Sequence, residues 1–252
     1  MDKLTGKIAL ITGGGGGIGR ATALAFAAEG AKVVVADLDE ATARAVADEV
    51  SAAGGDAISL AVDVSRDDQV TAMVEQVVAR HGRLDIAFNN AAIDIEHEPL
   101  AQCSEDMFDR LMSVNVKGVW LCMRREIQQM LKQGGGVIVN TSSIGGYGGA
   151  PRQPIYGATK HAVIGLTKAA ALEYGRKGIR VNAVCPGVIR TPMMERAIER
   201  EPRRKAHVEQ IHPIGRVGEA SEIARAVVFL SSDDASFVLG ESLMVDGGYT
   251  AR

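Results

Sequence analysis

The sequence predicts an α/β protein in which a doubly wound parallel sheet of about seven strands is flanked by helices. Two observations predict this fold. Short runs rich in β-branched residues alternate with longer segments that carry apolar residues at helical spacing, along all 252 residues. The short runs are almost continuously apolar, which is typical of strands that are covered on both faces. Sustained alternation of this kind favours a parallel sheet between two layers of helices.

The expected strands are seven apolar runs, at residues 7–12, 32–37, 57–64, 84–90, 136–143, 179–186 and 241–248. Helical spacing is clear between them, at residues 17–30, 66–82, 104–132 and 154–175. Glycines at positions 30, 82 and 178 follow helical segments and supply the left-handed residue with which many helices end. Because no linker or low-complexity stretch divides the chain, we expect one domain over residues 1–252.

The composition argues against several classes of function. With 28 Lys and Arg against 31 Asp and Glu, the formal net charge is −3, which provides no positive field for DNA or an anionic membrane. No apolar run approaches the roughly 20 residues of a membrane helix, and the N-terminus lacks the pattern of a secretory signal. The three cysteines are scattered without a CxxC pair, and no histidines have metal-ligand spacing. We therefore expect a cytoplasmic protein with reduced thiols and no metal.

A glycine-rich loop directly follows the first expected strand and opens a helix. Its sequence, ITGGGGGIGRA, places Gly13, Gly17 and Gly19 in a T-G-x-x-x-G-x-G pattern. Glycine lets the backbone approach a pyrophosphate closely, and the free N–H groups at the start of a helix attract negative charge. A plain tight turn is the alternative, but the strand–loop–helix context favours a dinucleotide site, in which we include Ile18.

Asp37 stands at the end of the second expected strand, eighteen residues after Gly19. A carboxylate at this place accepts a hydrogen bond from the adenosine ribose of NAD and repels the 2′-phosphate of NADP. The following residues, Leu38 and Asp39, supply no cation for that phosphate. The sequence therefore favours NAD over NADP, and a second role of Asp37 as a helix cap is compatible with this.

Further motifs follow in order along the chain: Asp63-Val64, NNAA at 89–92, Asn115, YGATK at 156–160, PGVIRTP at 186–192 and DGG at 246–248. With the glycine loop and Asp37, they make the chain resemble the short-chain dehydrogenase/reductase family over essentially its whole length. Ala92 departs from the glycine that the family usually has there. The resemblance implies a Rossmann fold and metal-free hydride transfer between NAD(H) and a secondary alcohol or carbonyl substrate. It also implies a homotetramer, although the sequence alone would allow a dimer.

Within this family likeness, Tyr156 is the expected acid/base and Lys160 its partner. The two residues lie four apart in a helical segment, so their side chains can converge on one face. A unit charge about 4 Å away, at an effective dielectric near 20, is worth about 4 kcal/mol. The Lys160 ammonium is therefore expected to lower the pKa of Tyr156 toward neutral pH, where acid/base catalysis is most efficient.

The resemblance also assigns roles to Ser143 and Asn115. Ser143 lies thirteen residues before Tyr156, which is the spacing of the family's catalytic serine, and its hydroxyl would bind the substrate oxygen. The neighbouring Ser142 is the alternative, but adjacent residues of a strand point to opposite sides. Asn115 is expected to help hold a water that links Lys160 to solvent; alternatively, it is a buried residue bonded to the backbone.

The resemblance divides the remaining cofactor contacts between the two halves of the dinucleotide. The adenosine half would be contacted by Asp63, Val64, Asn89 and Ala91, and the nicotinamide half by Pro186, Gly187, Val188 and Thr191, next to Tyr156 and Lys160. The candidate substrate pocket is mostly apolar, with Ile93, Ile95, Gly145, Tyr147, Gln153, Val188, Met193 and Met194. Arg152 and the basic residues 203–205 suit either an anionic substrate or a solvated surface, and His97 either frames the entrance or packs at the surface.

The charged stretch 190–212 is the only shift in composition along the chain. It suits either a pair of solvated surface helices or a lid, and the resemblance places a substrate lid at residues 188–216. The predicted function is NAD-dependent oxidation of a secondary alcohol, or the reverse reduction. The alternatives are an NADP-dependent carbonyl reductase, an NAD-retaining epimerase or dehydratase, and a non-catalytic dinucleotide sensor. An enoyl reductase would space its tyrosine and lysine more widely, and the substrate itself stays open among sugars, cyclic diols, steroids and hydroxy acids.

Overall fold

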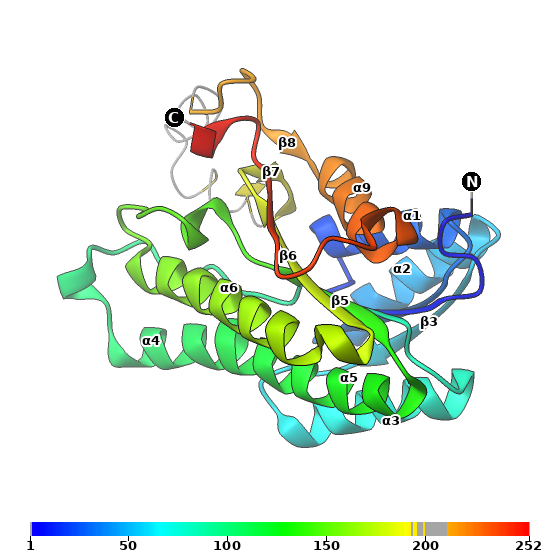
Figure 1. The fold of residues 1–252 in the computed structure, drawn as a ribbon. Helices are drawn as coiled ribbons and strands as arrows, with labels where there is room; N and C mark the ends of the chain where they lie inside the picture. The colour runs from blue at the N-terminus through cyan, green and yellow to red at the C-terminus, as the bar shows by residue number, and fades with distance from the viewer. Residues whose placement is uncertain (1, 193, 196–198, 200–210, 252) are drawn as a thin grey trace.

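The structure is a computed structural model that describes residues 2–192, 194–195, 199 and 211–251 (Figure 1). Its centre is a seven-stranded sheet of order β3-β2-β1-β4-β5-β6-β9, in which every neighbouring pair is parallel. The strands are β1 (Ile8–Thr12), β2 (Lys32–Asp37), β3 (Asp56–Ala61), β4 (Ile86–Asn89), β5 (Gly136–Thr141), β6 (Ile179–Pro186) and β9 (Ser242–Val245). The predicted α/β class and the seven expected strands are confirmed.

Helices cover both faces of the sheet (Figure 1). One face carries α3 (Asp67–His81), α4 (Glu105–Met112), α5 (Val119–Gln133) and α6 (Pro154–Tyr174), and the other carries α1 (Gly17–Ala28), α2 (Glu40–Ala52) and α9 (Ala220–Ser231). Each layer closes its own apolar core against the sheet, since the strands present buried side chains to both sides. In the described part of the chain, no helix is long and apolar enough to cross a membrane.

The strand order reverses between β1 and β4. The chain winds from β1 outward to β2 and β3, and then crosses back to build β4, β5, β6 and β9 on the other side. Loops that leave the carboxyl ends of β1 and β4 therefore part in opposite directions and leave a crevice between them. In open α/β sheets this crevice is the usual place for a ligand.

Two local features differ from the sequence-based expectation. The helix expected over 104–132 is interrupted by a π-helical segment, η2 (Ser113–Gly118), between α4 and α5. Such π turns occur frequently at functional sites, where they point side chains in directions that a regular α-helix does not allow. In addition, β7 (Ile189–Arg190) and β8 (Gly218–Glu219) form a small separate pair that joins the start of the expected lid segment to the residues just after it.

Candidate active site

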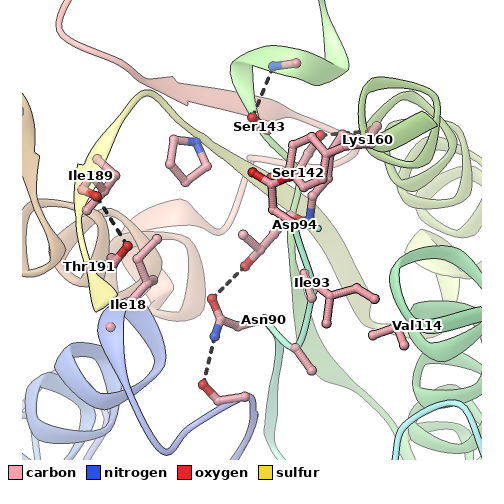
Figure 2. Close-up of a pocket in the computed structure, with 18 of the residues that line it drawn as sticks. Ile18, Asn90, Ile93, Asp94, Val114, Ser142, Ser143, Lys160, Ile189 and Thr191 are labelled. Carbon is pink, nitrogen blue, oxygen red and sulfur yellow. Dashed lines mark hydrogen bonds between the residues drawn. The ribbon is translucent and has the colours of Figure 1, made fainter. Parts of the chain in front are cut away.

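A cavity of about 1630 Å³ opens at the carboxyl ends of the central strands, where the strand order reverses. Typical small-molecule pockets hold ~300–1,000 Å³, so this cavity has room for a dinucleotide and a substrate together. Figure 2 shows Ser143, Asp94 and Lys160 on one side of it and Ile18, Ile189 and Thr191 on the other. The predicted site residues that line it are Gly13, Gly17, Ile18, Asp37, Asp63, Val64, Ala91, Ser143, Tyr156, Lys160, Pro186, Gly187, Val188 and Thr191.

The glycine-rich segment packs too tightly for side chains at several positions, among them Gly13 and Gly19. A Cβ at Gly13 would lie 2.8 Å from Cα of Ala91, and the backbone there has a φ of +62°. A Cβ at Gly19 would lie 2.0 Å from the carbonyl oxygen of Gly13, so helix α1 sits directly on the loop. Gly19 itself does not line the cavity; its role in the structure is this close packing.

The start of α1 fits a pyrophosphate. Its cap residue Gly16 offers no side chain to the first N–H groups, and the first turn contains no acidic residue. Gly15, Gly16 and Gly17 line the cavity at this end. These open amides and the positive end of the helix dipole suit an anion.

Asp37 is fixed at the end of β2. Its Oδ2 accepts a hydrogen bond of 2.9 Å from the backbone N–H of Gly15, and its Oδ1 accepts one of 3.2 Å from the N–H of Asp39. The basic residues that line the cavity in the described part of the chain are Arg110, Arg152 and Lys160, and none belongs to β2 or its following turn. The carboxylate is thus presented to the cavity without a nearby cation for a phosphate.

Three of the predicted catalytic side chains meet at the end of β5. Tyr156 and Lys160 lie on one face of α6, with the Lys160 Nζ 5.5 Å from the centroid of the Tyr156 ring. Lys160 is 2% exposed, and its Nζ donates a hydrogen bond of 3.0 Å to the carbonyl oxygen of Thr141. The Ser143 hydroxyl acts on the Tyr156 phenol and lowers its pKa, whereas the Ser142 hydroxyl donates to the carbonyl oxygen of Lys160 at 2.9 Å. The two serine side chains therefore point in different directions, as expected.

The predicted direction of the Tyr156 pKa is wrong for the protein alone. Burial raises the pKa of the Tyr156 phenol, the negative charge of Asp94 raises it further, and only the hydrogen bond from Ser143 lowers it. Burial also lowers the pKa of Lys160 to about 8. The reason is that desolvation dominates for both groups. The Lys160 Nζ lies over the Tyr156 ring and bonds Thr141, and it does not offset the burial of the phenol.

Asn115 holds a loop rather than lining the cavity. It is fully buried in the π turn, and its Oδ1 accepts a hydrogen bond of 2.8 Å from the N–H of Ile93. Its Nδ2 donates to the carbonyl oxygen of Ile93 at 2.9 Å and to the Thr159 hydroxyl at 3.3 Å. Of the two interpretations of Asn115, the buried residue bonded to backbone is the one that the structure displays.

Of the two neighbouring asparagines, Asn90 lines the cavity and the predicted Asn89 does not. The Asn89 side chain is 2% exposed and turns into the core, where its Nδ2 donates to Glu126 and Asn140. Asn90 lines the cavity, and its Nδ2 donates to the carbonyl oxygen of Gly13 at 3.0 Å. Neighbouring residues of a strand face opposite sides, so only one of this pair reaches the cavity.

Two carboxylates in the loop after β4 escaped the sequence analysis. Asp94 lines the cavity beside Gln153, and Glu96 is fully buried and accepts hydrogen bonds from the N–H groups of Ile155 and Tyr156. The signal in the sequence is the alternation IDIE at residues 93–96, in which two acidic residues alternate with isoleucines just beyond a strand. At His97, the carbonyl oxygen accepts a hydrogen bond from Arg152, and the side chain does not line the cavity.

The candidate substrate residues divide into two groups. Ile93, Gly145, Gln153, Val188 and Met194 line the cavity, whereas Ile95 does not and Tyr147 is half-exposed outside it. Met193 and the basic residues 203–205 lie outside the described residues. From the expected lid, Thr191, Pro192 and Ile211 reach the cavity, which Tyr249 near the C-terminus also lines.

Comparisons with known proteins identify the family of the chain. A family model described as "Enoyl-(Acyl carrier protein) reductase" matches residues 13–250. The chain is 47% identical to a 2,5-dichloro-2,5-cyclohexadiene-1,4-diol dehydrogenase of Sphingobium indicum, over 100% of both chains. It is 45% identical to a cyclohexanol dehydrogenase of Acinetobacter sp., over 100% of this chain and 98% of the relative.

Solved structures with the same fold include named oxidoreductases. A crystal structure of levodione reductase superposes with a TM-score of 0.95 at 43% identity, covering 98% of this chain and 99% of that chain. The structure of ElxO with NADP bound has a TM-score of 0.92 at 35% identity, covering 98% of this chain and 99% of that chain. The fold and site thus define an NAD(P)-dependent oxidoreductase that acts on alcohol and carbonyl groups. The chain belongs to the short-chain dehydrogenase/reductase family.

Proposed function

We propose that this chain is an NAD-dependent dehydrogenase of secondary alcohols carried on a six-membered ring, and that it reduces the matching ketones in the reverse direction. The observation that carries the proposal is the convergence of Ser143, Tyr156 and Lys160 in one cavity with the glycine loop and Asp37. Relatives named for cyclohexanol and for a dichlorocyclohexadiene diol, at 45% and 47% identity, support a ring alcohol.

In the proposed reaction, the hydroxyls of Ser143 and Tyr156 bind the substrate oxygen. When bound, the oxidised nicotinamide supplies the hydride acceptor and a positive charge. Tyr156 takes the hydroxyl proton during oxidation and returns it during reduction. Because burial raises the pKa of Tyr156, the phenol becomes a base only where positive charge offsets this effect. In this proposal the Lys160 ammonium, 5.5 Å from the centroid of the Tyr156 ring, contributes such charge. By family likeness, Asn115 helps hold the water that connects Lys160 to solvent.

The preference for NAD rests on Asp37. Its fixed carboxylate suits a ribose hydroxyl, and a 2′-phosphate placed there would meet a negative charge. The structural relative with bound NADP shares the fold, so the fold itself does not decide between the two cofactors. In this proposal the residues at the end of β2 and in the following turn determine the choice between NAD and NADP.

We further propose the roles that follow from family likeness for the rest of the chain. Residues 1–252 act as one domain, with a lid over the substrate at 188–216. The chain assembles as a homotetramer through the long helices of residues 104–132 and 154–175; exposed Trp120 on α5 and Leu172 on α6, at 43% and 86% exposure, support such packing. The cysteines Cys103, Cys122 and Cys185 are free thiols, which supports a reducing, cytoplasmic location.

The test is a panel of alcohols assayed with NAD and NADP side by side, followed by the absorbance of the reduced cofactor. We expect oxidation of cyclohexanol, weak or no oxidation of a primary alcohol, and a kcat/KM for NAD at least about tenfold above that for NADP. The inactive control is Tyr156→Phe, with NADH binding measured separately. Failure to oxidise any secondary alcohol with either cofactor would exclude the proposed function.

A second candidate is enoyl reduction, which the description of the matching family model favours. It transfers hydride to a carbon–carbon double bond, and by family likeness its tyrosine and lysine stand further apart than Tyr156 and Lys160. An enoyl thioester in the same panel, assayed with NADH and NADPH, separates the two functions.

A further inference from the structure

An acidic side chain lies beside the proposed base. Asp94 lines the cavity with Tyr156 and Ser143, and Figure 2 shows it on the same side as Ser143 and Lys160. Its Oδ2 accepts a hydrogen bond of 2.7 Å from Nε2 of Gln153, which also lines the cavity. Ile18 and Thr191, where the cofactor is expected, lie across the cavity from Asp94, so Asp94 belongs to the substrate side.

The backbone that carries Asp94 is anchored on both sides. Asn115 binds both the N–H and the carbonyl oxygen of Ile93, at 2.8 and 2.9 Å. Two residues further on, the buried Glu96 accepts hydrogen bonds from the N–H groups of Ile155 and Tyr156, at 3.1 and 2.8 Å. The Asp94 carboxylate is therefore held in place before any ligand arrives, as a preorganised binding group should be.

The charge of Asp94 opposes the proposed chemistry. It adds to the effect of burial and raises the pKa of Tyr156, so a neutral side chain here would leave the phenol easier to ionise. Natural proteins break such local rules mainly at functional positions, where the unfavourable group performs a second task. A carboxylate that faces the substrate space is suited to such a task.

We propose that Asp94, held by Gln153, is a substrate-binding residue that accepts a hydrogen bond from a second hydroxyl group of the substrate. The preferred substrates are then diols or polyols, and this inference rests on the proposed function. Hydroxyl groups bond carboxylates strongly, and the Gln153 amide has a second N–H and a carbonyl oxygen to complete the contact. An anionic substrate would be repelled, and the nearby Arg152 directs its Nε to the carbonyl oxygen of His97.

The test compares the wild-type protein with Asp94→Asn and with the control Glu98→Gln. Asn keeps an oxygen for Gln153 but removes the charge, and Glu98 is an exposed acid of the same loop that does not line the cavity. The substrates are cyclohexanol, the cis and trans isomers of cyclohexane-1,2-, 1,3- and 1,4-diol, and 4-hydroxycyclohexanecarboxylate. NADH binding and thermal melting verify that each variant is folded.

For the wild type and for Glu98→Gln, we expect kcat/KM for at least one diol to exceed that for cyclohexanol by roughly 10- to 100-fold. In Asp94→Asn this ratio should fall to within about threefold, and kcat/KM for the hydroxycarboxylate should rise. Oxidation of cyclohexanol without preference for any diol, or a preference that survives in Asp94→Asn, would overturn this inference and leave the proposed function standing. Absence of any alcohol oxidation would overturn both.

Discussion

A carboxyl group that the proposed reaction does not use is buried between the sheet and α5. Glu126 is 0% exposed, and its Oε2 accepts a hydrogen bond of 2.9 Å from Nδ2 of Asn89. Its Oε1 has no hydrogen-bond partner among the described residues. Burial raises the pKa of Glu126 to about 8, and the bond from Asn89 offsets only part of this effect. The folded protein therefore carries a protonated Glu126 at neutral pH.

This pKa couples the stability of the fold to pH. In the unfolded chain the carboxyl titrates near its ordinary pKa of 4.5, so between pH 4.5 and about 8 the folded state binds more protons. The stabilising contribution of Glu126 to the free energy of unfolding is complete below pH 4.5 and is lost as pH rises toward 8. At about 1.4 kcal/mol per pKa unit, the free energy of unfolding decreases on the order of 3 kcal/mol by pH 7 and on the order of 5 kcal/mol above pH 8.

The perturbation is Glu126→Gln, which resembles the protonated carboxyl and keeps an oxygen for Asn89. We expect the variant and the wild type to be closest in stability near pH 5. The variant should then become the more stable protein as pH rises, by up to a few kcal/mol above pH 8. The assay is urea unfolding at a series of pH values and a fixed protein concentration, so that any assembly contributes equally to both proteins.

The control is Glu75→Gln, which removes an exposed carboxylate from α3. Its pH profile should run parallel to that of the wild type. The reasoning would be refuted if the stability of Glu126→Gln changed with pH as steeply as that of the wild type. A constant loss of stability at every pH would likewise mean that Glu126 is ionised in the fold.

Three further predictions concern the site. Replacing Tyr156 by Phe should lower kcat by at least about 100-fold, while NADH titration shows unchanged binding; a smaller loss would assign the proton transfer elsewhere. The double change Asp37→Ser with Leu38→Arg should shift the NAD-to-NADP ratio of kcat/KM by about 100-fold toward NADP, because it exchanges a negative charge for a positive one at the ribose. In Lys160→Met, activity should disappear but stability at pH 7 should rise on the order of 3 kcal/mol, since burial of the ammonium lowers its pKa from 10.5 to about 8. An unchanged or lower melting temperature would contradict this last expectation.

The parts of the site that could be predicted from the sequence are those fixed by local spacing. The loop at Gly13 must lack side chains because Gly19 in the first turn of α1 packs directly against it. A spacing of four residues places Tyr156 and Lys160 on one helical face. Ser143 is selected over Ser142 by the thirteen-residue spacing to Tyr156 that the family likeness supplies, and Ser142 indeed bonds the carbonyl oxygen of Lys160. None of these inferences needs to know what packs against the segment.

Tertiary surroundings decided what the sequence could not. Asn89 and Asn90 are chemically identical, and only the register of β4 determines that the second one faces the cavity. The helix expected over 104–132 bends through a π turn because Asn115 must reach the backbone of Ile93, some twenty residues earlier in the chain. The pKa of Tyr156 depends on burial and on Asp94, neither of which can be obtained from the spacing to Lys160.

Two buried ionisable groups give this fold opposite dependences on pH that meet near pH 8. Through Glu126, stability falls as pH rises from 4.5 to about 8, and through Lys160 it rises from about pH 8 to 10.5, because the folded state then binds fewer protons. The combined contribution of the two groups to stability is therefore smallest near pH 8. Oxidation of an alcohol releases a proton, so the proposed reaction becomes more favourable as pH rises through this same range. The two differ in what their removal would change. Glu126 does not line the cavity, so a substitution there can increase stability without altering the site. The burial of Lys160 beside Tyr156 is part of the proposed chemistry, so its destabilising effect cannot be removed without loss of the proposed activity.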